Sequence, residues 1–290
     1  MPSRSYAHRR HKQVRREQIM RPIVVRGGGD LATGTIHRLG RSGYPVIILE
    51  NDRPSAIRRL VAFSQAVYDG ETEVEGMVCR KVESAEEALA LAAPMSPVLL
   101  VDPACSLLGI LQPEILVDAI LAKRNLGTRR DMAEMTIALG PGFEAGRDVD
   151  YVVETKRGHY LGRILNKGCA IPNTGVPGMI GGYGKERVVH SDRAGIFRVN
   201  ASIGDWVEAG NPVGYVETTD GQCFPQITEI SGVLRGILPD GYRVTEHFKS
   251  ADVDPREESR AHCTLISDKA RCIAGSVLEL VSAFEKGMLK

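Results

Sequence analysis

The segment RGGGDLATG, residues Arg26–Gly34, follows the apolar run Pro22–Val25 and precedes a stretch with helical periodicity. Three consecutive glycines between a strand and a helix are typical of a tight turn that another group approaches closely. The segment therefore predicts the first strand–turn–helix unit of a parallel α/β sheet. Asp30 argues against a pyrophosphate at this turn, because its carboxylate would compete with phosphate for the helix N-terminus.

The same turn fits the dinucleotide-binding pattern G-x-G-x-x-[GA]. Glu50 lies 21 residues after Gly29, at the end of the next predicted strand, where a carboxylate would meet ribose hydroxyls. The predicted cofactor-binding residues of this unit are Gly27, Gly28, Gly29, Asp30, Ala32 and Glu50. The structural alternative is that the glycines only form a tight turn and that Asp30 is the helix N-cap.

Strand-like and helix-like runs alternate through the first half of the chain. We expect strands at 23–26, 45–50 and 98–102, helices at 31–42, 56–64 and 85–93, and extended chain at 74–82. Further strands are expected at 115–121, 135–139 and 151–154. This alternation predicts a Rossmann-like α/β domain with a parallel sheet and helices on both faces.

Polar residues follow three of these apolar runs. The predicted site residues here are Lys123 and Asn125, Gly140 and Gly142, and Arg157 and His159. Carboxyl ends of parallel strands share one edge of a sheet, so these groups would converge there and suit an anionic ligand. The alternative is a set of ordinary loops whose charges pair with each other, for example Arg157 with Glu154. We expect no metal site.

From Val188 onward the chain is rich in short β segments and contains an internal repeat. Residues 195–207 and 232–244 superpose at an offset of 37 residues. Two such β halves predict a barrel-sandwich hybrid of the biotinyl/lipoyl type. The hairpin between the halves, residues 215–224, contains no lysine, which excludes a swinging-arm carrier. The Gly- and Pro-rich stretch 172–184 is expected to be a linker or a lid, and a helix is expected at 270–284.

Charge and cysteine patterns narrow the class of protein. Residues 1–21 hold seven basic residues and one acidic residue, although the whole chain has a net charge of +1. We expect this tail to be disordered; a nucleic-acid-binding arm is the alternative reading. No stretch is apolar enough for a secretory signal or a membrane span. Six separated cysteines indicate reduced thiols, and hence a cytoplasmic location.

Seven motifs together resemble the YqeB-type accessory proteins of selenium-dependent molybdenum hydroxylases. They are RGGGDLATG, AKRNLGT, LGPGF, ETKRGHYLGR, PNTGVPG, DVDPR and SDKAR, and the resemblance extends over residues 22–286. It implies an XdhC-like N-terminal part and a role in hydroxylase maturation. The implied ligand is a molybdenum cofactor, a pterin dinucleotide, and the implied partner is the apo-hydroxylase. No interaction with nucleic acid or membrane is expected.

Four regions follow from this interpretation: a basic tail (1–21), a Rossmann-like domain (22–187), a barrel-sandwich module (188–256) and a C-terminal segment whose helix docks on the α/β domain (257–290). The leading function is a maturation factor that binds the molybdenum cofactor, or a nucleotide-like anion, and delivers it to the apo-enzyme. An NAD-dependent oxidoreductase and a non-catalytic docking scaffold are the alternatives. His159 is the natural proton carrier, but no catalytic residue is assigned.

Overall fold

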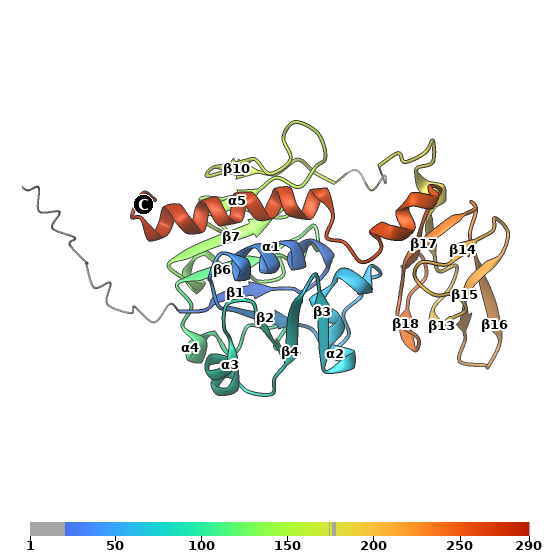
Figure 1. Cartoon of the computed structure of the whole chain (residues 1–290), viewed down its shortest axis with the longest axis horizontal. Coiled ribbons are helices and arrows are strands. Elements are labelled where there is room, and N and C mark those ends of the chain that lie inside the picture. Colours follow the sequence, from blue (N-terminus) through green and yellow to red (C-terminus); the bar gives the residue numbers. More distant parts are fainter. Residues whose placement is uncertain (1–20, 174, 176–177, 290) are drawn as a thin grey trace, which may run out of the picture.

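The computed structural model describes residues 21–173, 175 and 178–289. These residues form an α/β part, made of residues 21–187 and the C-terminal helix, and a β module of residues 188–254 (Figure 1). The predicted basic tail lies outside the described residues except for Arg21. The predicted linker or lid, 172–184, is described except at residues 174, 176 and 177.

The α/β part is built on a nine-stranded sheet. Its strand order is β10 (Ile164–Leu165), β9 (Tyr151–Val153), β7 (Met135–Leu139), β6 (Ile115–Asp118), β1 (Ile23–Arg26), β2 (Val46–Glu50), β5 (Val98–Val101), β4 (Met77–Lys81), β3 (Glu71–Val74). The seven strands from β9 to β4 run parallel, whereas β10 and β3 pair antiparallel at the two edges. The central strands are buried along their whole length, as a sheet covered on both faces requires.

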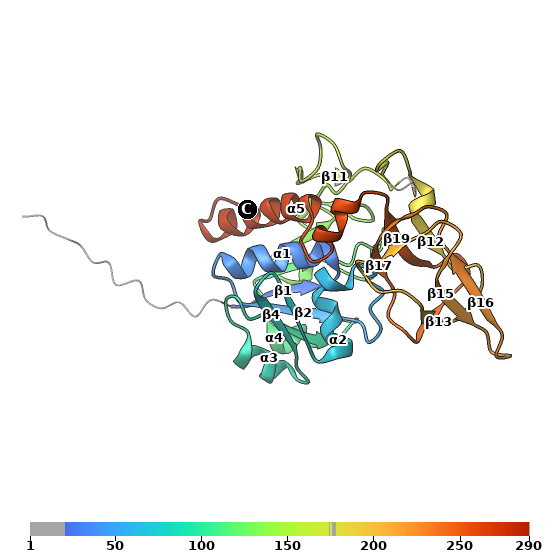
Figure 2. The ribbon, with the colours of Figure 1, turned by 45° about the vertical axis from the view of Figure 1, so that its right-hand side comes forward.

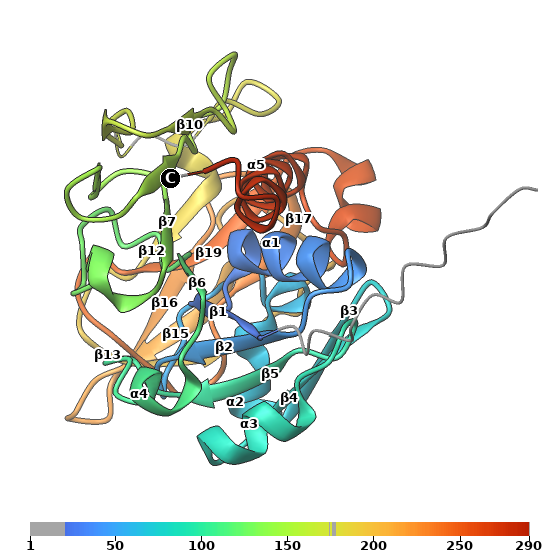
Figure 3. The same cartoon turned by 90° about the vertical axis from the view of Figure 1, so that its left-hand side faces the viewer.

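Helices cover both faces of this sheet (Figure 3). α1 (Asp30–Arg41) and α5 (Asp268–Glu285) pack side by side on one face, and α3 (Ala85–Leu91) and α4 (Leu108–Leu111) lie on the other. Gly34 allows the close approach of α5 to α1, because a Cβ at this position would lie 2.7 Å from the Cβ of Ala270. The last helix of the chain therefore completes the core of its first unit.

Shorter elements complete the α/β part and its connection to the β module. A small sheet pairs β8 (Glu144–Ala145) with β11 (Gly168–Cys169). The remaining helical elements are α2 (Ala66–Asp69) and the 3-10 turns η1 (Arg59–Val61), η2 (Phe63–Gln65), η3 (Arg130–Met132), η4 (Lys185–Arg187) and η5 (Glu257–His262).

The β module consists of two antiparallel sheets. One has the order β12 (Val188–His190), β19 (Lys249–Asp254), β17 (Gly232–Ile237), β14 (Trp206–Val207). The other has the order β16 (Cys223–Ile227), β15 (Pro212–Glu217), β13 (Gly195–Val199), β18 (Tyr242–Val244). Inward-facing residues of both sheets, among them Phe197, Val213, Leu234 and Val253, form one apolar core.

The predicted fold class, a Rossmann-like parallel sheet with a barrel-sandwich hybrid module, is wrong. The large sheet is mixed, because its two edge strands, β10 and β3, pair antiparallel with β9 and β4. The repeated β segments of the sequence fall in different sheets, since β13 pairs with β15 and β18 whereas β17 pairs with β14 and β19. Strand patterning fixes which faces are buried, but it does not specify which strands become neighbours.

Most local elements follow the expected pattern. β1, β7 and α3 lie within a residue or two of the predicted bounds, and the predicted helix 270–284 is α5. Two expectations are wrong. Residues 56–64 form 3-10 turns instead of a helix, and the extended chain 74–82 is interrupted by a turn at Glu75 and Gly76, both with left-handed backbone. Glycine favours that conformation, which reverses the chain into a hairpin.

The β module lies beyond the carboxyl ends of the parallel strands, which point toward it in Figure 1. The backbone N–H of Ile237 donates to the carbonyl of Ile57 at 2.9 Å, and the Arg59 guanidinium donates to the carbonyl of Ile237 at 2.9 Å. Figure 2 shows that η5 and the start of α5 lie beside this junction. The edge that carries the predicted site residues therefore faces the β module.

In the described part of the chain, no helix combines the length and apolar character needed to cross a membrane.

Candidate anion-binding site

A cavity of about 500 Å³ opens at the carboxyl edge of the large sheet. We call it the basic pocket; its lining residues are Leu31, Leu121, Lys123, Pro141, Thr155, Lys156, Arg157, Ile171, Pro172, Asn173, Gly178 and Lys269. They follow strands β1, β6, β7, β9 and β11 or begin α5. A neighbouring hollow shares Lys123 and Pro141 with it and adds Gly142 and Cys169.

A larger cavity of about 680 Å³ lies at the opposite edge of the sheet. Its lining is mostly apolar, with Pro22, Leu89 and Ile110 among its members and Arg21 as its one cation. Binding sites combine an apolar wall with several convergent polar groups. The basic pocket meets that description and the larger cavity does not.

Four cationic side chains line the basic pocket: Lys123, Lys156, Arg157 and Lys269. They come from three segments far apart in the sequence. Arg157 forms a two-pronged ion pair with Asp268, with nitrogen–oxygen distances of 2.7 and 3.0 Å. Among the described residues the three lysines make no ion pair. The pocket therefore holds more positive than negative charge, which favours an anion.

The loop that carries Lys123 is anchored by a buried polar triad. Arg26 donates to the Asp118 carboxylate at 3.4 Å and to the Thr128 hydroxyl, which itself donates to Asp118 at 2.5 Å. Burial raises the pKa of Asp118, and the bonds from Thr128 and Arg26 oppose that shift. Leu121 and Lys123 have left-handed backbone, with φ of 60° and 64°. Such conformations are uncommon outside glycine, and they gather at functional loops.

Glu154 anchors the loop that carries Lys156 and Arg157. It is buried, and its Oε1 accepts the backbone N–H groups of Thr155 and Lys156 at 2.7 Å each. Its Oε2 accepts the backbone N–H of Ile171 at 2.7 Å, which joins the two segments of the pocket wall. Glu154 therefore pairs with neither Arg157 nor His159. Its role in this structure is to position the wall.

Lys269 lies in the first turn of α5, where the Ser267 hydroxyl caps the helix by accepting the backbone N–H of Ala270 at 3.2 Å. Burial lowers the pKa of Lys269, and the nearby Arg157 guanidinium lowers it further. A cation at this position also faces the positive end of the helix dipole. All three effects disfavour the ammonium, and an anion beside it would oppose them.

The glycine turn after β1 is occupied by groups of the protein itself. The Gly28 N–H donates to Glu50 at 2.8 Å, and the Gly28 carbonyl accepts the backbone N–H of Ser64 at 2.8 Å. The other oxygen of Glu50 accepts two bonds from Asn51 at 2.8 Å each. Burial raises the pKa of Glu50 while these bonds lower it. Both of its oxygens therefore have partners that stabilise the turn.

The remaining residues of this unit have separate surroundings. Gly27 has a φ of 93° and packs against the backbone of residues 119–120, whereas a Cβ at Gly29 would meet no atom within 4 Å. Gly29 is the N-cap of α1, so the expectation that Asp30 is the N-cap is wrong. Asp30 begins the helix, accepts the N–H of Leu31 at 2.9 Å and lies 3.5 Å from Arg58. Ala32 is buried in the core.

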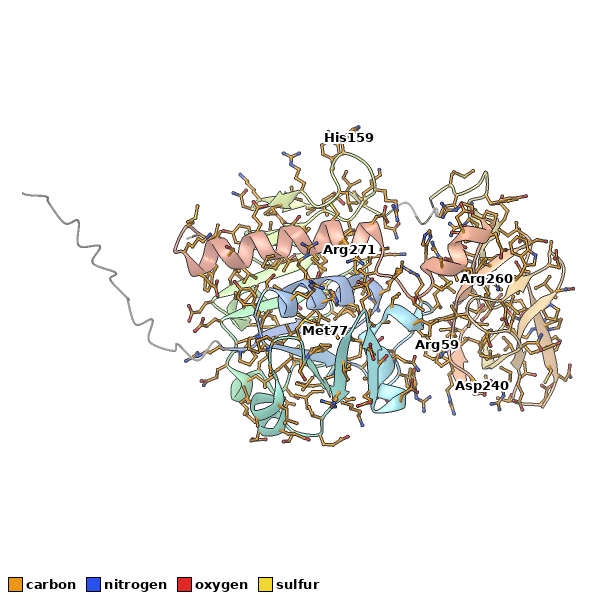
Figure 4. All side chains as sticks on the ribbon, viewed as in Figure 1. Arg59, Met77, His159, Asp240, Arg260 and Arg271 are labelled. Atoms are coloured by element: carbon orange, nitrogen blue, oxygen red, sulfur yellow. The ribbon has the colours of Figure 1, made fainter. Side chains whose placement is uncertain are left out.

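The other predicted site residues divide between the pocket and its supports. Asn125 forms a turn, because its side chain accepts the N–H of Thr128 at 2.8 Å and donates to the Thr128 carbonyl at 2.8 Å. Gly140 has left-handed backbone and lies too close to Thr155 for any side chain. Gly142 lines the neighbouring hollow. His159 lies exposed on its loop and away from the pocket lining (Figure 4).

Of the predicted residues, Lys123 and Arg157 therefore line the basic pocket. Lys156 and Lys269 were not predicted as site residues. Lys156 stands next to Arg157 within the motif ETKRGHYLGR, and Lys269 stands within SDKAR at a predicted helix start. A cation in the first turn of a helix is unfavourable, so the position of Lys269 at the predicted helix start was the feature of the sequence that could have marked it as a site residue. In the described ranges, no three His, Cys, Asp or Glu side chains gather in a way that could hold a metal ion.

Comparison with known structures gives only weak likenesses. An aspartoacylase family protein from Mesorhizobium loti matches 50% of this chain and 58% of its own, with 12% identity and a TM-score of 0.26. A succinylglutamate desuccinylase/aspartoacylase from Rhodobacter sphaeroides matches 82% of this chain and 87% of its own, with 12% identity and a TM-score of 0.26. TM-scores this low assign neither a fold nor a function.

Comparison with curated protein sequences gives one strong similarity. No protein-family model matches the chain. A protein of Escherichia coli K12, described as uncharacterized protein YqeB, is 49% identical over 257 residues, which are 89% of this chain and 46% of the relative. That description mentions neither molybdenum nor selenium, so it does not support the expected role of these two elements. The chain is thus similar to YqeB and spans about half the length of that relative.

Proposed function

We propose that the protein binds a phosphate-bearing, nucleotide-like anion in the basic pocket. The observation that carries this proposal is the convergence of four cations from three separate segments on one cavity. One carboxylate, that of Asp268, offsets one of them through its ion pair with Arg157. The remaining positive charge is available to a ligand.

The shape and the chemistry of the pocket favour a ligand with both an anionic group and a flat or apolar group. Its volume of about 500 Å³ lies within the range of small-molecule sites. Leu31, Leu121 and Ile171 supply an apolar wall beside the cations. A nucleotide combines these two properties, with a ring for the wall and phosphate for the cations.

The direct test is calorimetric titration with ADP, with adenosine as the uncharged comparison. ADP should bind and adenosine should bind far more weakly. Lys123→Met should weaken ADP binding about tenfold or more, the scale of one hydrogen bond to a charged group. Lys167→Met is the matched control, because Lys167 is exposed and lies outside the pocket lining. Equal loss in both variants, or no binding of ADP, would contradict the proposal.

For the cellular role, we propose an accessory factor that holds a molybdenum pterin dinucleotide and delivers it to an apo-hydroxylase in the cytoplasm. Support comes from the seven sequence motifs and from the similarity to YqeB. The pterin dinucleotide carries phosphate, as the pocket chemistry favours. NAD is less well supported, because Glu50 and the glycine turn are engaged with each other.

The cellular role is tested by native mass spectrometry of protein purified from a host that makes the cofactor. A retained pterin dinucleotide supports the accessory role, and retained NAD supports the oxidoreductase alternative. A bound hydroxylase without any small molecule supports the docking scaffold.

A further inference from the structure

A cluster of charged side chains crosses the junction between the two parts of the protein. We call it the junction cluster; it consists of Asp30, Arg58 and Arg187 from the α/β part and Arg235, Lys249 and Asp252 from the β module. Asp30 begins α1 directly after β1, and Arg235 and Asp252 lie in β17 and β19 of the β module. Beside it, Asp254 pairs with Arg256 at 2.9 Å and also with Arg235 of the cluster at 3.5 Å; counting Asp254 and Arg256 together leaves the net charge of the cluster unchanged.

Arg187 is the most buried cation of the cluster, with 4% of its side chain exposed. One terminal nitrogen donates to Asp252 at 3.2 Å and the other donates to the carbonyl of Gly178 at 3.3 Å. Its Nε is buried and has no hydrogen-bond partner among the described residues. An unpaired donor on a buried cation carries a large desolvation cost.

Arg58 also has a buried Nε without a hydrogen-bond partner in the described chain. Its side chain is 11% exposed, and its nearest carboxylate, Asp30, lies at 3.5 Å. One terminal nitrogen donates to the carbonyls of His262 and Leu265 at 3.4 and 3.1 Å. These neutral acceptors position the guanidinium, whose charge is offset by Asp30 alone among the carboxylates that pair with it in the described chain.

Lys249 is the accessible member of the cluster. The residue is exposed, and within the described part of the chain its ammonium makes no ion pair or hydrogen bond. Burial by surrounding atoms lowers its pKa, and Arg235 and Arg187 act in the same direction. Asp252 and Asp30 oppose that shift. Lys249 begins β19, the strand that also carries Asp252.

The six side chains contain four cations and two carboxylates, an excess of two positive charges in a partly buried region. Uncompensated charge away from water is unfavourable, and a dianion would offset it. We propose that the junction cluster is a second anion subsite that takes a phosphate group, with Lys249 as its accessible contact. The subsite would involve both parts of the protein, which gives the β module a role in binding.

The junction cluster and the basic pocket are adjacent. Asp30 precedes Leu31 of the pocket, and Arg187 donates to Gly178 of the pocket. If the basic pocket binds an anion as proposed above, one ligand with two separated anionic groups can occupy both subsites. The inferred ligand class is then a bisphosphate or a dinucleotide with a terminal phosphate.

The first experiment counts sites by equilibrium dialysis of the whole protein with radiolabelled inorganic phosphate. The wild type should bind two phosphate ions per chain, and Lys249→Met and Lys123→Met should each lose one of the two. Arg243→Met is the control, because Arg243 is an exposed cation of β18 outside the cluster. Thermal unfolding of each variant confirms that it is folded. Lys249 is replaced instead of Arg187 because Arg187 is buried, and its replacement would destabilise the fold.

The second experiment compares hexanediol bisphosphate with hexyl phosphate. A ligand that spans both subsites should bind the wild type more tightly than hexyl phosphate does, and Lys249→Met should abolish that advantage. No advantage in the wild type would show that the second subsite takes a free phosphate only, and would overturn the inferred ligand class.

The outcomes separate the two proposals. A single site that Lys123→Met removes and Lys249→Met leaves intact would overturn the second subsite while the basic pocket stands. A single site that only Lys249→Met removes would support the subsite and contradict the pocket. No binding by the wild type would overturn both.

Discussion

Replacing Glu154 with glutamine tests whether one buried carboxylate holds the wall of the basic pocket. The carboxylate accepts three backbone N–H groups, two on its own loop and one from Ile171, each at 2.7 Å. Glutamine has the same shape but only one oxygen. If that oxygen keeps the two local bonds, the side-chain NH₂ faces the N–H of Ile171, and two donors meet without an acceptor.

The expected cost follows from these contacts. One charge-assisted hydrogen bond is lost, worth about 1.5–3 kcal/mol, and a buried N–H is left unpaired, which costs about 1–3 kcal/mol. The two surviving bonds also weaken, because their acceptor is no longer charged. Allowing for partial overlap between these effects, we expect Glu154→Gln to lower the free energy of local opening of the loop by about 3 kcal/mol.

Amide hydrogen exchange measures this opening directly. The N–H groups of Thr155, Lys156 and Ile171 should exchange roughly 100-fold faster, since about 1.4 kcal/mol corresponds to tenfold in an equilibrium constant. ADP titration of the same variant should show weaker binding, because Lys156 and Ile171 line the pocket. Glu279→Gln, an exposed position of α5, is the matched control for the change in charge.

Unchanged exchange at these three amides would refute the reasoning, because it would mean that the hydrogen bonds of Glu154 contribute nothing to the loop. Faster exchange with unchanged ADP affinity would separate the effect of Glu154 on loop stability from its effect on ADP binding. Glu154 would then stabilise the loop, and the loop would not be part of the binding site.

Asp268→Asn should strengthen phosphate binding a few-fold by freeing Arg157. It should change the free energy of unfolding by less than about 1 kcal/mol, because the side chains of Arg157 and Asp268 are 58% and 74% exposed. Weaker binding in a calorimetric titration would show that Asp268 instead positions Arg157. Phosphate affinity should fall as pH rises through the lowered pKa of Lys269, because deprotonation removes a cation, and the fall should start below the usual lysine range. Lys269→Arg should remove this pH dependence. An identical pH profile in that variant would exclude Lys269 as the cause. Gly28→Ala should cost about 1–3 kcal/mol in denaturant unfolding, since its Cβ would meet a backbone nitrogen at 2.9 Å. Gly29→Ala should be nearly neutral at its open position, and equal losses in the two variants would contradict this account.

Most of the local elements, and the edge of the sheet that carries the site, could be predicted from the amino-acid sequence. Apolar runs with strand or helix periodicity mark β1, β7, α3 and α5, because burial of one face is a property of neighbouring residues in the chain. Lys123 and Arg157 were predicted for the same reason: each follows an apolar run, and parallel strands bring their carboxyl ends to one edge.

The tertiary structure alone decided which groups meet at that edge. Arg157 pairs with Asp268, 111 residues away, and not with the nearby Glu154. The glycine turn binds Glu50 of its own chain, and the sheet gains antiparallel edges that its strand patterns do not require. Arg58 packs against β17 of the β module, since a Cβ at Gly236 would lie 3.2 Å from the Cγ of Arg58. Each outcome depends on contacts between residues distant in sequence, and the local pattern of hydrophobic and polar residues carries no information about such partners.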